Sequence, residues 1–207
     1  MARSRRYKVP FRRRREGKTD YNLRRKLVLS GKRRVVVRRS NTQTTIQLVS
    51  SQPQGDVTHM TVTTNNLVAF GWKGGTGNIP ASYLTGYFFA KKVLAQKDLL
   101  EDDEELILDI GLSTKFYGGR TFAVLRGAVD GGLDIAHGSD KIFPSEERIR
   151  GEHIAGHAKV LAEQSKEEET GEGEKKANIY SKYKIKPEDL PSHFDELKGK
   201  IDSAKKL

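Results

Sequence analysis

Residues 33–64 read RRVVVRRSNTQTTIQLVSSQPQGDVTHMTVTT and contain three short runs that are rich in β-branched residues. The runs cover residues 33–40, 44–50 and 57–64. The segments between them, Ser40-Asn41 and residues 52–56, have the composition of turns. On the second run, Ile46 and Leu48 alternate with polar residues, so one face of the strand is apolar. The pattern predicts a three-stranded antiparallel meander whose outward Thr and Gln side chains leave a polar face.

After the meander, the apolar residues change to helical spacing and then to a second strand. Residues 79–96 carry an apolar stripe and have Pro80 in the first turn, which favours a helix capped by Asn78 or Ile79. An acidic segment leads into residues 106–110, Leu-Ile-Leu-Asp-Ile, which indicate a buried strand. Further helices are expected over residues 120–129 and 145–164. This order predicts an α/β fold: a mixed, mostly antiparallel sheet with helices packed on it, plus a basic extended N-terminal arm and a C-terminal extension.

The chain is expected to divide into three parts. Residues 1–31 form a basic RNA-binding arm and a short helix, residues 32–164 an α/β core, and residues 165–207 a linker and C-terminal extension. The linker is placed at residues 166–176 because this segment is charged, contains Gly and lacks large apolar residues. The tail beyond it regains apolar residues, which is compatible with a short docking segment and helix or with disorder in isolation.

Charge is distributed very unevenly along the sequence. Residues 1–40 contain 17 Lys and Arg but only 2 Asp and Glu, a net charge of +15, whereas the remaining 167 residues have a net charge of −4. The overall charge of +11 is therefore a local property of the N-terminal part. A polyanion such as RNA is the expected partner of so concentrated a cationic segment.

The arm itself, residues 1–19, has too little apolar surface and too much like charge to fold alone. Its cations would neutralise phosphates, and Arg also pairs with phosphate in a bidentate manner. Tyr7, Phe11 and Tyr21 interleave with these cations and are suited to stack on unpaired bases, which favours RNA over duplex DNA. The alternatives are a solvated tail, a localisation signal and a chaperone that binds nucleic acids without preference.

A short helix is predicted directly after the arm, from Tyr21 to Ser30. Asp20 is a suitable N-cap residue and Gly31 a suitable C-terminal stop. Leu23 and Leu27 recur at helical spacing, so their side chains are expected to face inward.

The glycine-rich segment at residues 71–78, GWKGGTGN, precedes a helix but lacks the spacing of a P-loop. It is interpreted as a turn that presents Lys73 and backbone N–H groups to an RNA backbone, or as a purely structural loop. His153 and His157 have the i, i+4 spacing of metal ligands, yet no third ligand stands out. Exposed or packing histidines are the preferred interpretation of this pair.

An enzymatic alternative also exists, because Asp109, Asp130 and Asp134 resemble the strand-borne carboxylates of a two-metal nuclease. Carboxylates at the ends of strands and helices are common for capping and solubility, so a non-enzyme without metal or cofactor is favoured. The chain has no Cys, which excludes disulfides and thiolate chemistry. No apolar run of about 18 residues is present, so no membrane partner is expected. A small-molecule substrate is not expected either, because a non-enzyme is favoured.

Several long segments of the sequence are similar to those of a known family. They are residues 7–21 (YKVPFRRRREGKTDY), 71–78 (GWKGGTGN), 108–112 (LDIGL), 127–135 (GAVDGGLDI) and 147–154 (ERIRGEHI). In this order they resemble the archaeal-type large-subunit ribosomal protein eighteen family, whose eukaryotic counterpart is the large-subunit protein five. The resemblance covers roughly residues 5–160.

This resemblance implies a structural protein of the large ribosomal subunit in the cytoplasm. Its implied partners are 5S rRNA, 23S-type rRNA and neighbouring large-subunit proteins, and its implied role is to attach 5S rRNA in the central protuberance. The tail is expected to be a lineage-specific extension that touches rRNA or a neighbouring protein. The residues expected to bind rRNA are Arg3, Arg5, Arg6, Tyr7, Lys8, Phe11, Arg12, Arg13, Arg14, Arg15, Lys18, Tyr21, Arg24, Arg25, Lys73, Lys115 and Arg120.

Overall fold

The centre of the molecule is a five-stranded sheet with the strand order β3-β2-β1-β4-β5. The computed structural model describes residues 6–100, 104–168, 180 and 183–204 of the chain. The strands are β1 (Arg34–Arg39), β2 (Thr44–Gln52), β3 (Gly55–Thr63), β4 (Leu106–Asp109) and β5 (Ile135–Ala136). Strands β1, β2 and β3 form the predicted antiparallel meander, while β4 pairs in parallel with both β1 and β5. The expectation of a mixed sheet is confirmed, although the two-residue strand β5 was not predicted.

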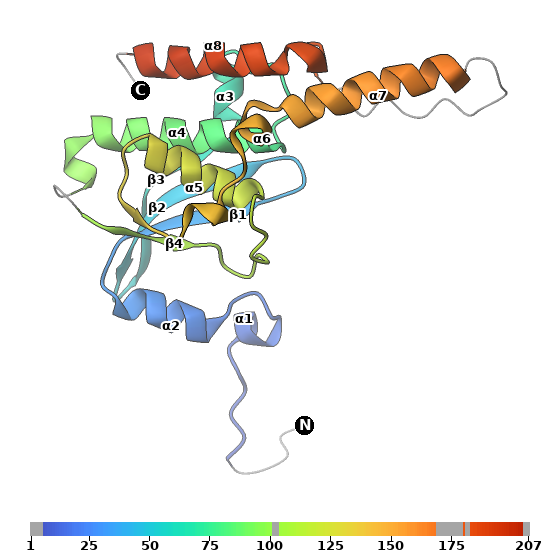
Figure 1. The fold of residues 1–207 in the computed structure, drawn as a ribbon. Coiled ribbons are helices and arrows are strands. Elements are labelled where there is room, and N and C mark those ends of the chain that lie inside the picture. The colour runs from blue at the N-terminus through green and yellow to red at the C-terminus, as the bar shows by residue number, and fades with distance from the viewer. Residues whose placement is uncertain (1–5, 101–103, 169–179, 181–182, 205–207) are drawn as a thin grey trace.

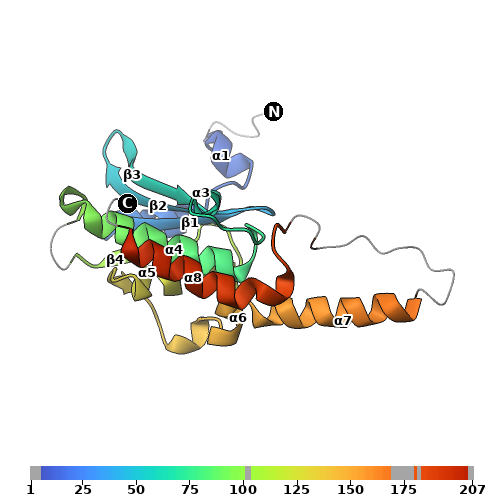
Figure 2. The ribbon, with the colours of Figure 1, turned by 90° about the horizontal axis from the view of Figure 1, so that it is seen from above.

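Helices cover one face of this sheet in two layers. The α-helices are α1 (Arg12–Arg15), α2 (Tyr21–Leu29), α3 (Asn66–Ala69), α4 (Ile79–Ala95), α5 (Arg120–Asp130), α6 (Glu146–Arg150), α7 (Glu152–Glu168) and α8 (Leu190–Ser203). Short 3₁₀ turns lie at Lys97–Leu99, Asp140–Ile142 and Pro187–Asp189. Helices α4 and α5 lie on the sheet, α8 lies on the outer side of α4, and α1 and α2 lie on the opposite side of the sheet (Figures 1 and 2).

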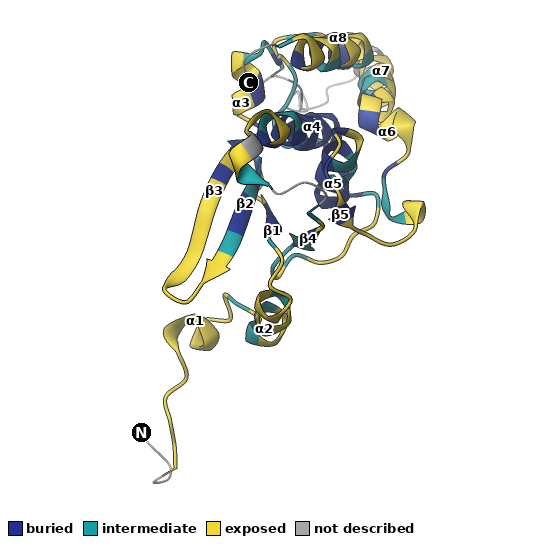
Figure 3. Ribbon diagram, turned by 90° about the vertical axis from the view of Figure 1, so that its left-hand side faces the viewer, coloured by how far each residue is buried: buried dark blue, intermediate teal, exposed yellow. Residues whose placement is uncertain are grey.

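Helices α4 and α5 approach each other so closely that backbone meets backbone. A Cβ atom added at Gly86 would lie 2.0 Å from the carbonyl oxygen of Val124, and one at Gly127 would lie 2.1 Å from that of Tyr83. Any side chain larger than hydrogen would push the two helices apart. The close crossing lets α4 bury nearly all of its circumference, so it forms the centre of the core (Figure 3).

Helix α8 completes this core from a distant part of the sequence. Its residues Leu190, Phe194, Leu197 and Ile201 are all at most 3% exposed and join the same apolar cluster as α4. The described part of the tail is therefore packed, which answers the question that its sequence left open. The division of the chain into three parts at residues 31 and 164 stays a prediction.

Two local predictions are wrong. The helix expected over residues 145–164 is interrupted at Gly151, whose positive φ of 90° ends α6 and lets α7 start in a new direction. Helix α2 does form, with Asp20 as its N-cap, but none of its residues is buried. Leu23 is 36% exposed rather than inward-facing, because α2 stands off from the sheet instead of packing onto it.

Candidate RNA interface

Among the described residues before α2, all are exposed except the half-buried Thr19 (Figure 3). Residues 6–16 are all exposed, and residues 7–11 have neither helical nor strand structure. The four arginines of α1 form a single helical turn with no buried residue. Arg3 and Arg5 of the predicted interface lie outside the described residues. Residues 7–11 thus lie outside helices and strands, and the four arginines that follow form one helical turn. An extended RNA-binding arm stays a prediction.

The cations of this segment are held only by weak surface contacts. Arg12 lies 3.6 Å and Lys18 lies 2.8 Å from the carboxylate of Glu16, and all three side chains are substantially exposed. Such exposed ion pairs contribute little and exchange readily for other partners. The Arg13 Nε donates to the hydroxyl of Thr19 over 3.0 Å. These side chains are therefore available to a polyanion.

The aromatic residues of the segment are also accessible. Phe11 is 78% exposed and Tyr7 is 51% exposed, although burying them would stabilise the fold. Phe11 and Tyr21 lie with their ring centroids 6.4 Å apart, tilted by 39°. Exposed aromatic rings among cations are suited to stack on unpaired bases.

Helix α2 is fixed to the sheet through charged side chains rather than through apolar packing. The Arg24 guanidinium donates over 2.8 Å to Asp56 at the start of β3. The other oxygen of Asp56 lies 2.8 Å from Arg34 on β1. Burial raises the pKa of Asp56, but the hydrogen bonds and charges of Arg34 and Arg24 outweigh it and hold this pKa below its usual value. The carboxylate of Asp56 therefore stays ionised and joins α2 to the sheet.

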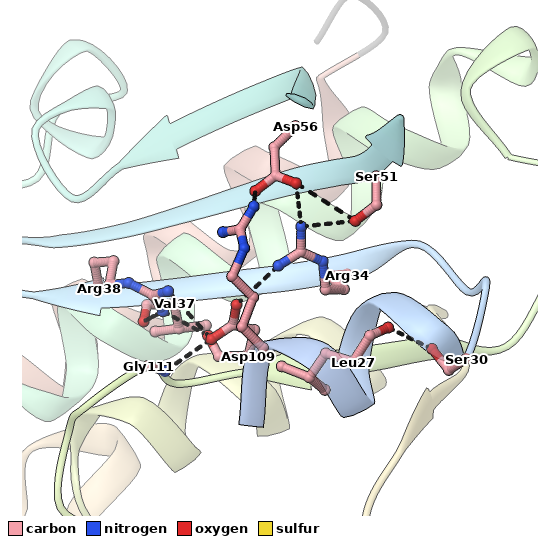
Figure 4. Close-up of polar contacts among 10 residues, drawn as sticks. Leu27, Ser30, Arg34, Val37, Arg38, Ser51, Asp56, Asp109 and Gly111 are labelled. Atoms are coloured by element: carbon pink, nitrogen blue, oxygen red, sulfur yellow. Dashed lines mark hydrogen bonds and ion pairs between the residues drawn. The ribbon is translucent and has the colours of Figure 1, made fainter. Parts of the chain in front are cut away.

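Arg34 is the centre of this polar cluster, because its side chain is only 2% exposed (Figure 4). It lies between Asp56 and Asp109, with Nη1 3.2 Å from a carboxylate oxygen of Asp109 and Nη2 3.0 Å from the hydroxyl of Ser51. Asp109 also accepts hydrogen bonds from Arg38, at 3.1 Å, and from the backbone N–H of Gly111, at 2.8 Å. The two carboxylates and the arginines alternate, so no charge in the cluster is left without a counterion.

A groove of about 400 Å³ lies between the arm and the sheet. One wall comes from α1, α2 and the turn between them, and the other from Arg38 and residues 109–113 after β4. Sequence reasoning missed Arg38 and this loop as parts of a site. The one available signal was the arginine pair that follows Val37, since charged residues directly after a buried strand often belong to functional surfaces.

The glycine-rich segment at residues 71–78 lies away from this groove and is covered by the C-terminal part of the chain. The indole of Trp72 stacks on the imidazole of His193, with centroids 5.3 Å apart, and the Lys73 N–H donates to His193 Nε2. The Tyr183 ring lies against Gly75. The Lys73 side chain is exposed, whereas its backbone N–H is engaged by His193. That the loop presents Lys73 and other N–H groups to RNA stays a prediction.

Lys115 and Arg120 differ in their surroundings. Lys115 is exposed on the loop before α5. The Arg120 guanidinium donates to the carbonyl of Ser40 over 2.9 Å, and burial together with the neighbouring Arg39 lowers its pKa. Arg120 thus holds the β1–β2 turn and has only part of its donor set available.

The residues considered for catalysis do not assemble. Asp109 is saturated by arginines, Asp130 accepts from the Tyr83 hydroxyl at 2.7 Å, and Asp134 is exposed elsewhere. His157 bonds to the Tyr180 hydroxyl over 2.7 Å. Within the described ranges, no group of three His, Asp or Glu side chains is placed to hold a metal ion. The same ranges contain no helix long and apolar enough to span a bilayer.

Comparison with known proteins gives a consistent result along the chain. The family model described as "Ribosomal large subunit proteins 60S L5, and 50S L18" matches residues 5–106 and 101–138. The chain is 44% identical over 207 residues to the "Large ribosomal subunit protein uL18" of Methanobrevibacter smithii, with 99% of each chain covered. It is 47% identical over 204 residues to the protein of the same name from Methanosphaera stadtmanae, again with 99% coverage of both.

Proposed function

Since this chain belongs to the family of ribosomal large subunit proteins 60S L5 and 50S L18, we propose that it binds 5S rRNA and attaches it to 23S-type rRNA in the central protuberance. A protein of this family is a structural component of the large ribosomal subunit and not an enzyme. The observation that supports the proposal is the exposed basic segment before α2, joined to the α/β core by the Arg24–Asp56 ion pair.

The core and the arm have different tasks in this proposal. The arm supplies contacts to phosphates and stacking on bases, which together provide most of the affinity. The core fixes where α2 and the start of the arm lie, so that contacts form only on an RNA of suitable shape. The proposed rRNA-binding residues are the basic and aromatic residues of the arm and α2 together with the Lys73 loop, and Lys115 and Arg120 are secondary contacts. Neighbouring large-subunit proteins are the proposed partners of the remaining surface.

The experiment that tests this proposal is a mobility-shift competition. Labelled 5S rRNA is bound by the full chain at about physiological salt and is challenged with excess tRNA. Retention of the 5S complex is expected, because shape and unpaired bases are recognised as well as charge. Equal competition by tRNA would indicate that the protein binds RNA without preference and would contradict the 5S assignment.

A pair of charge-matched variants locates the binding surface. The first replaces Arg12, Arg13, Arg14 and Arg15 with Gln, and the second replaces the exposed Lys141, Lys159, Lys186 and Lys200 with Gln. Both lower the net charge by the same amount. The arm variant is expected to reduce the slope of log K against log salt by about 3, the value for four lost phosphate contacts. Equal slopes for the two variants would show that net charge, and not the arm, drives binding.

A further inference from the structure

The groove between the arm and the sheet is lined in a way that suits a single nucleotide. Four cations line it, namely Arg13, Lys18, Arg24 and Arg38. Its volume of about 400 Å³ lies in the range of small-ligand sites, roughly 300–1,000 Å³, and is too small for a duplex. Three of the four cations lie on the wall formed by the arm and α2, so an anionic occupant is favoured on that side.

Of the two carboxylates in the groove, Asp109 is paired with cations and Asp20 is bound by backbone N–H groups. Asp20 accepts hydrogen bonds from the backbone N–H groups of Asn22 and Leu23, at 2.9 and 3.1 Å. Asp109 is neutralised by Arg34 and Arg38. The charge of Asp109 is therefore offset within the protein, and the four lining cations outnumber the remaining carboxylate, Asp20.

The cations divide into engaged and available groups. Arg24 is held by Asp56, and Arg38 is held by Asp109. Arg13 makes no ion pair within the described part of the chain, and the Lys18 ammonium is 64% exposed beside Glu16. The available positive charge is thus concentrated on the arm side of the groove, where a phosphate would lie.

The remaining lining is apolar and accessible. Leu23 and Leu27 of α2 contribute to one wall, and Ile110 and Leu112 to the loop after β4. Leu112 is 58% exposed and Leu23 is 36% exposed, so both would lose contact with water if a flat apolar group entered. A nucleobase is such a group, and it is joined to a phosphate by a short ribose.

From this arrangement we propose that the groove takes one unpaired nucleotide of an RNA, with its base against the leucine side chains and its phosphates at Arg13 and Lys18. The proposal rests on the proposed function, since it assumes that the arm binds RNA. It adds a defined pocket to a surface that otherwise recognises a backbone. Bases that are splayed out of loops and bulges are the part of an RNA through which sequence is read.

The test uses the full chain and the variant Leu112→Gln, which keeps the approximate size and the charge of the side chain. Leu94→Gln is the matched control, because Leu94 is 47% exposed on α4 and lies outside the groove. Acylation of RNA 2′-hydroxyl groups is measured along 5S rRNA with each protein bound. Leu112→Gln is expected to weaken binding about fivefold and to restore reactivity at one unpaired nucleotide, while protections that depend on the arm persist.

The possible failures are distinguishable. If wild-type protein gives no specific protection of 5S rRNA, the proposed function fails and the groove proposal fails with it. If wild-type protein gives specific protection and Leu112→Gln leaves affinity and footprint unchanged, only the groove proposal is overturned. In that second case the groove would not be a nucleotide site, and a neighbouring protein would be the next occupant to test.

Discussion

A buried arginine is unusual, and Arg34 is stable only because carboxylates from two other strands meet it. Among the described residues its Nε finds no hydrogen-bond partner, so the two Nη groups supply the compensation for its burial. Asp109 and Asp56 provide the opposite charges, and the Ser51 hydroxyl accepts a further hydrogen bond. Removing either partner would leave a buried charge poorly paired, which costs far more than losing a surface ion pair.

At this scale, Asp109→Asn is expected to lower the free energy of unfolding by about 3 kcal/mol. Asp134→Asn is the control, since Asp134 is exposed, and a change within about 0.5 kcal/mol is expected. Urea denaturation followed by circular dichroism measures both. Similar small effects for the two variants would mean that the Asp109 pairs contribute little. Bound RNA is expected to stay uncleaved with the wild-type chain and with both variants. In a nuclease that used these carboxylates, the substitutions would abolish cleavage.

The helix crossing depends equally on single residues. Gly127→Ala places a methyl group about 2 Å from a backbone carbonyl of α4 and is expected to cost more than about 4 kcal/mol or to prevent folding. Gly156→Ala on α7 meets nothing within 4 Å and is expected to stabilise by up to about 1 kcal/mol. Thermal unfolding compares the two. A tolerated Gly127→Ala would show that α4 and α5 pack less closely than described.

Among the elements, α8 is attached through a histidine whose protonation state matters. His193 accepts the Lys73 N–H at Nε2, so its bound form is the neutral imidazole. Burial is the main cause that lowers its pKa, Lys73 and Lys200 lower it further, and Glu196 opposes them. A lowered pKa means that the unfolded chain takes up a proton first, so this contribution is lost as pH falls below 6.5.

Amide exchange in α8 is therefore expected to become faster between pH 7 and pH 5 after correction for the intrinsic exchange rate. His193→Gln keeps a hydrogen-bond acceptor but does not titrate, so its α8 exchange is expected to change much less over the same range. Hydrogen exchange with mass spectrometry resolves this helix from the rest. An equal change in both proteins would assign the pH dependence to other groups.

The sequence predicted most elements well where the signal was local. Asp20 and Asn78 cap their helices as expected, because an N-cap needs only a polar side chain and the next few N–H groups. The stand-off of α2 was missed, since helical spacing shows which residues share a face but not whether a sheet lies near enough to bury it. The contact between α8 and the glycine-rich loop was also missed. Lys73 and His193 are 120 residues apart, and local sequence patterns do not show such distant contacts.

The candidate site shows the same limit. The exposed cations of the arm followed directly from charge placement. The groove did not, because Leu112 and Arg38 become part of it only through the parallel pairing of β4 with β1. The sequence suggested Asp109 only as a possible metal-binding carboxylate of a nuclease. Its position between Arg34 and Arg38 results from the pairing of β4 with β1.

On the scale of the whole molecule, folding and RNA binding are expected to be separable. Residues 6–16 are exposed and take no part in the core. Deletion of residues 1–18, which retains Thr19 and the Asp20 cap, is expected to shift the unfolding midpoint by no more than about 1–2 °C. The same deletion is expected to weaken 5S rRNA binding at least a hundredfold at physiological salt. Calorimetry measures the unfolding midpoint of the deletion variant, and a mobility shift measures its affinity for 5S rRNA. A large loss of stability would contradict the separation of folding from RNA binding.

The parallel pairing of β1 with β4 also has a consequence for the order of folding. The meander is local, but Arg34 and Asp109 are 75 residues apart, so β1 stays an open edge until β4 arrives. Its core, Val35 to Val37, is the kind of segment that associates edge to edge, and arginine pairs flank it on both sides. Before they meet their carboxylates, these arginines would keep nascent chains apart by repulsion. Light scattering during refolding is expected to increase when Arg38 and Arg39 are replaced with Gln, and unchanged scattering would remove this protective role.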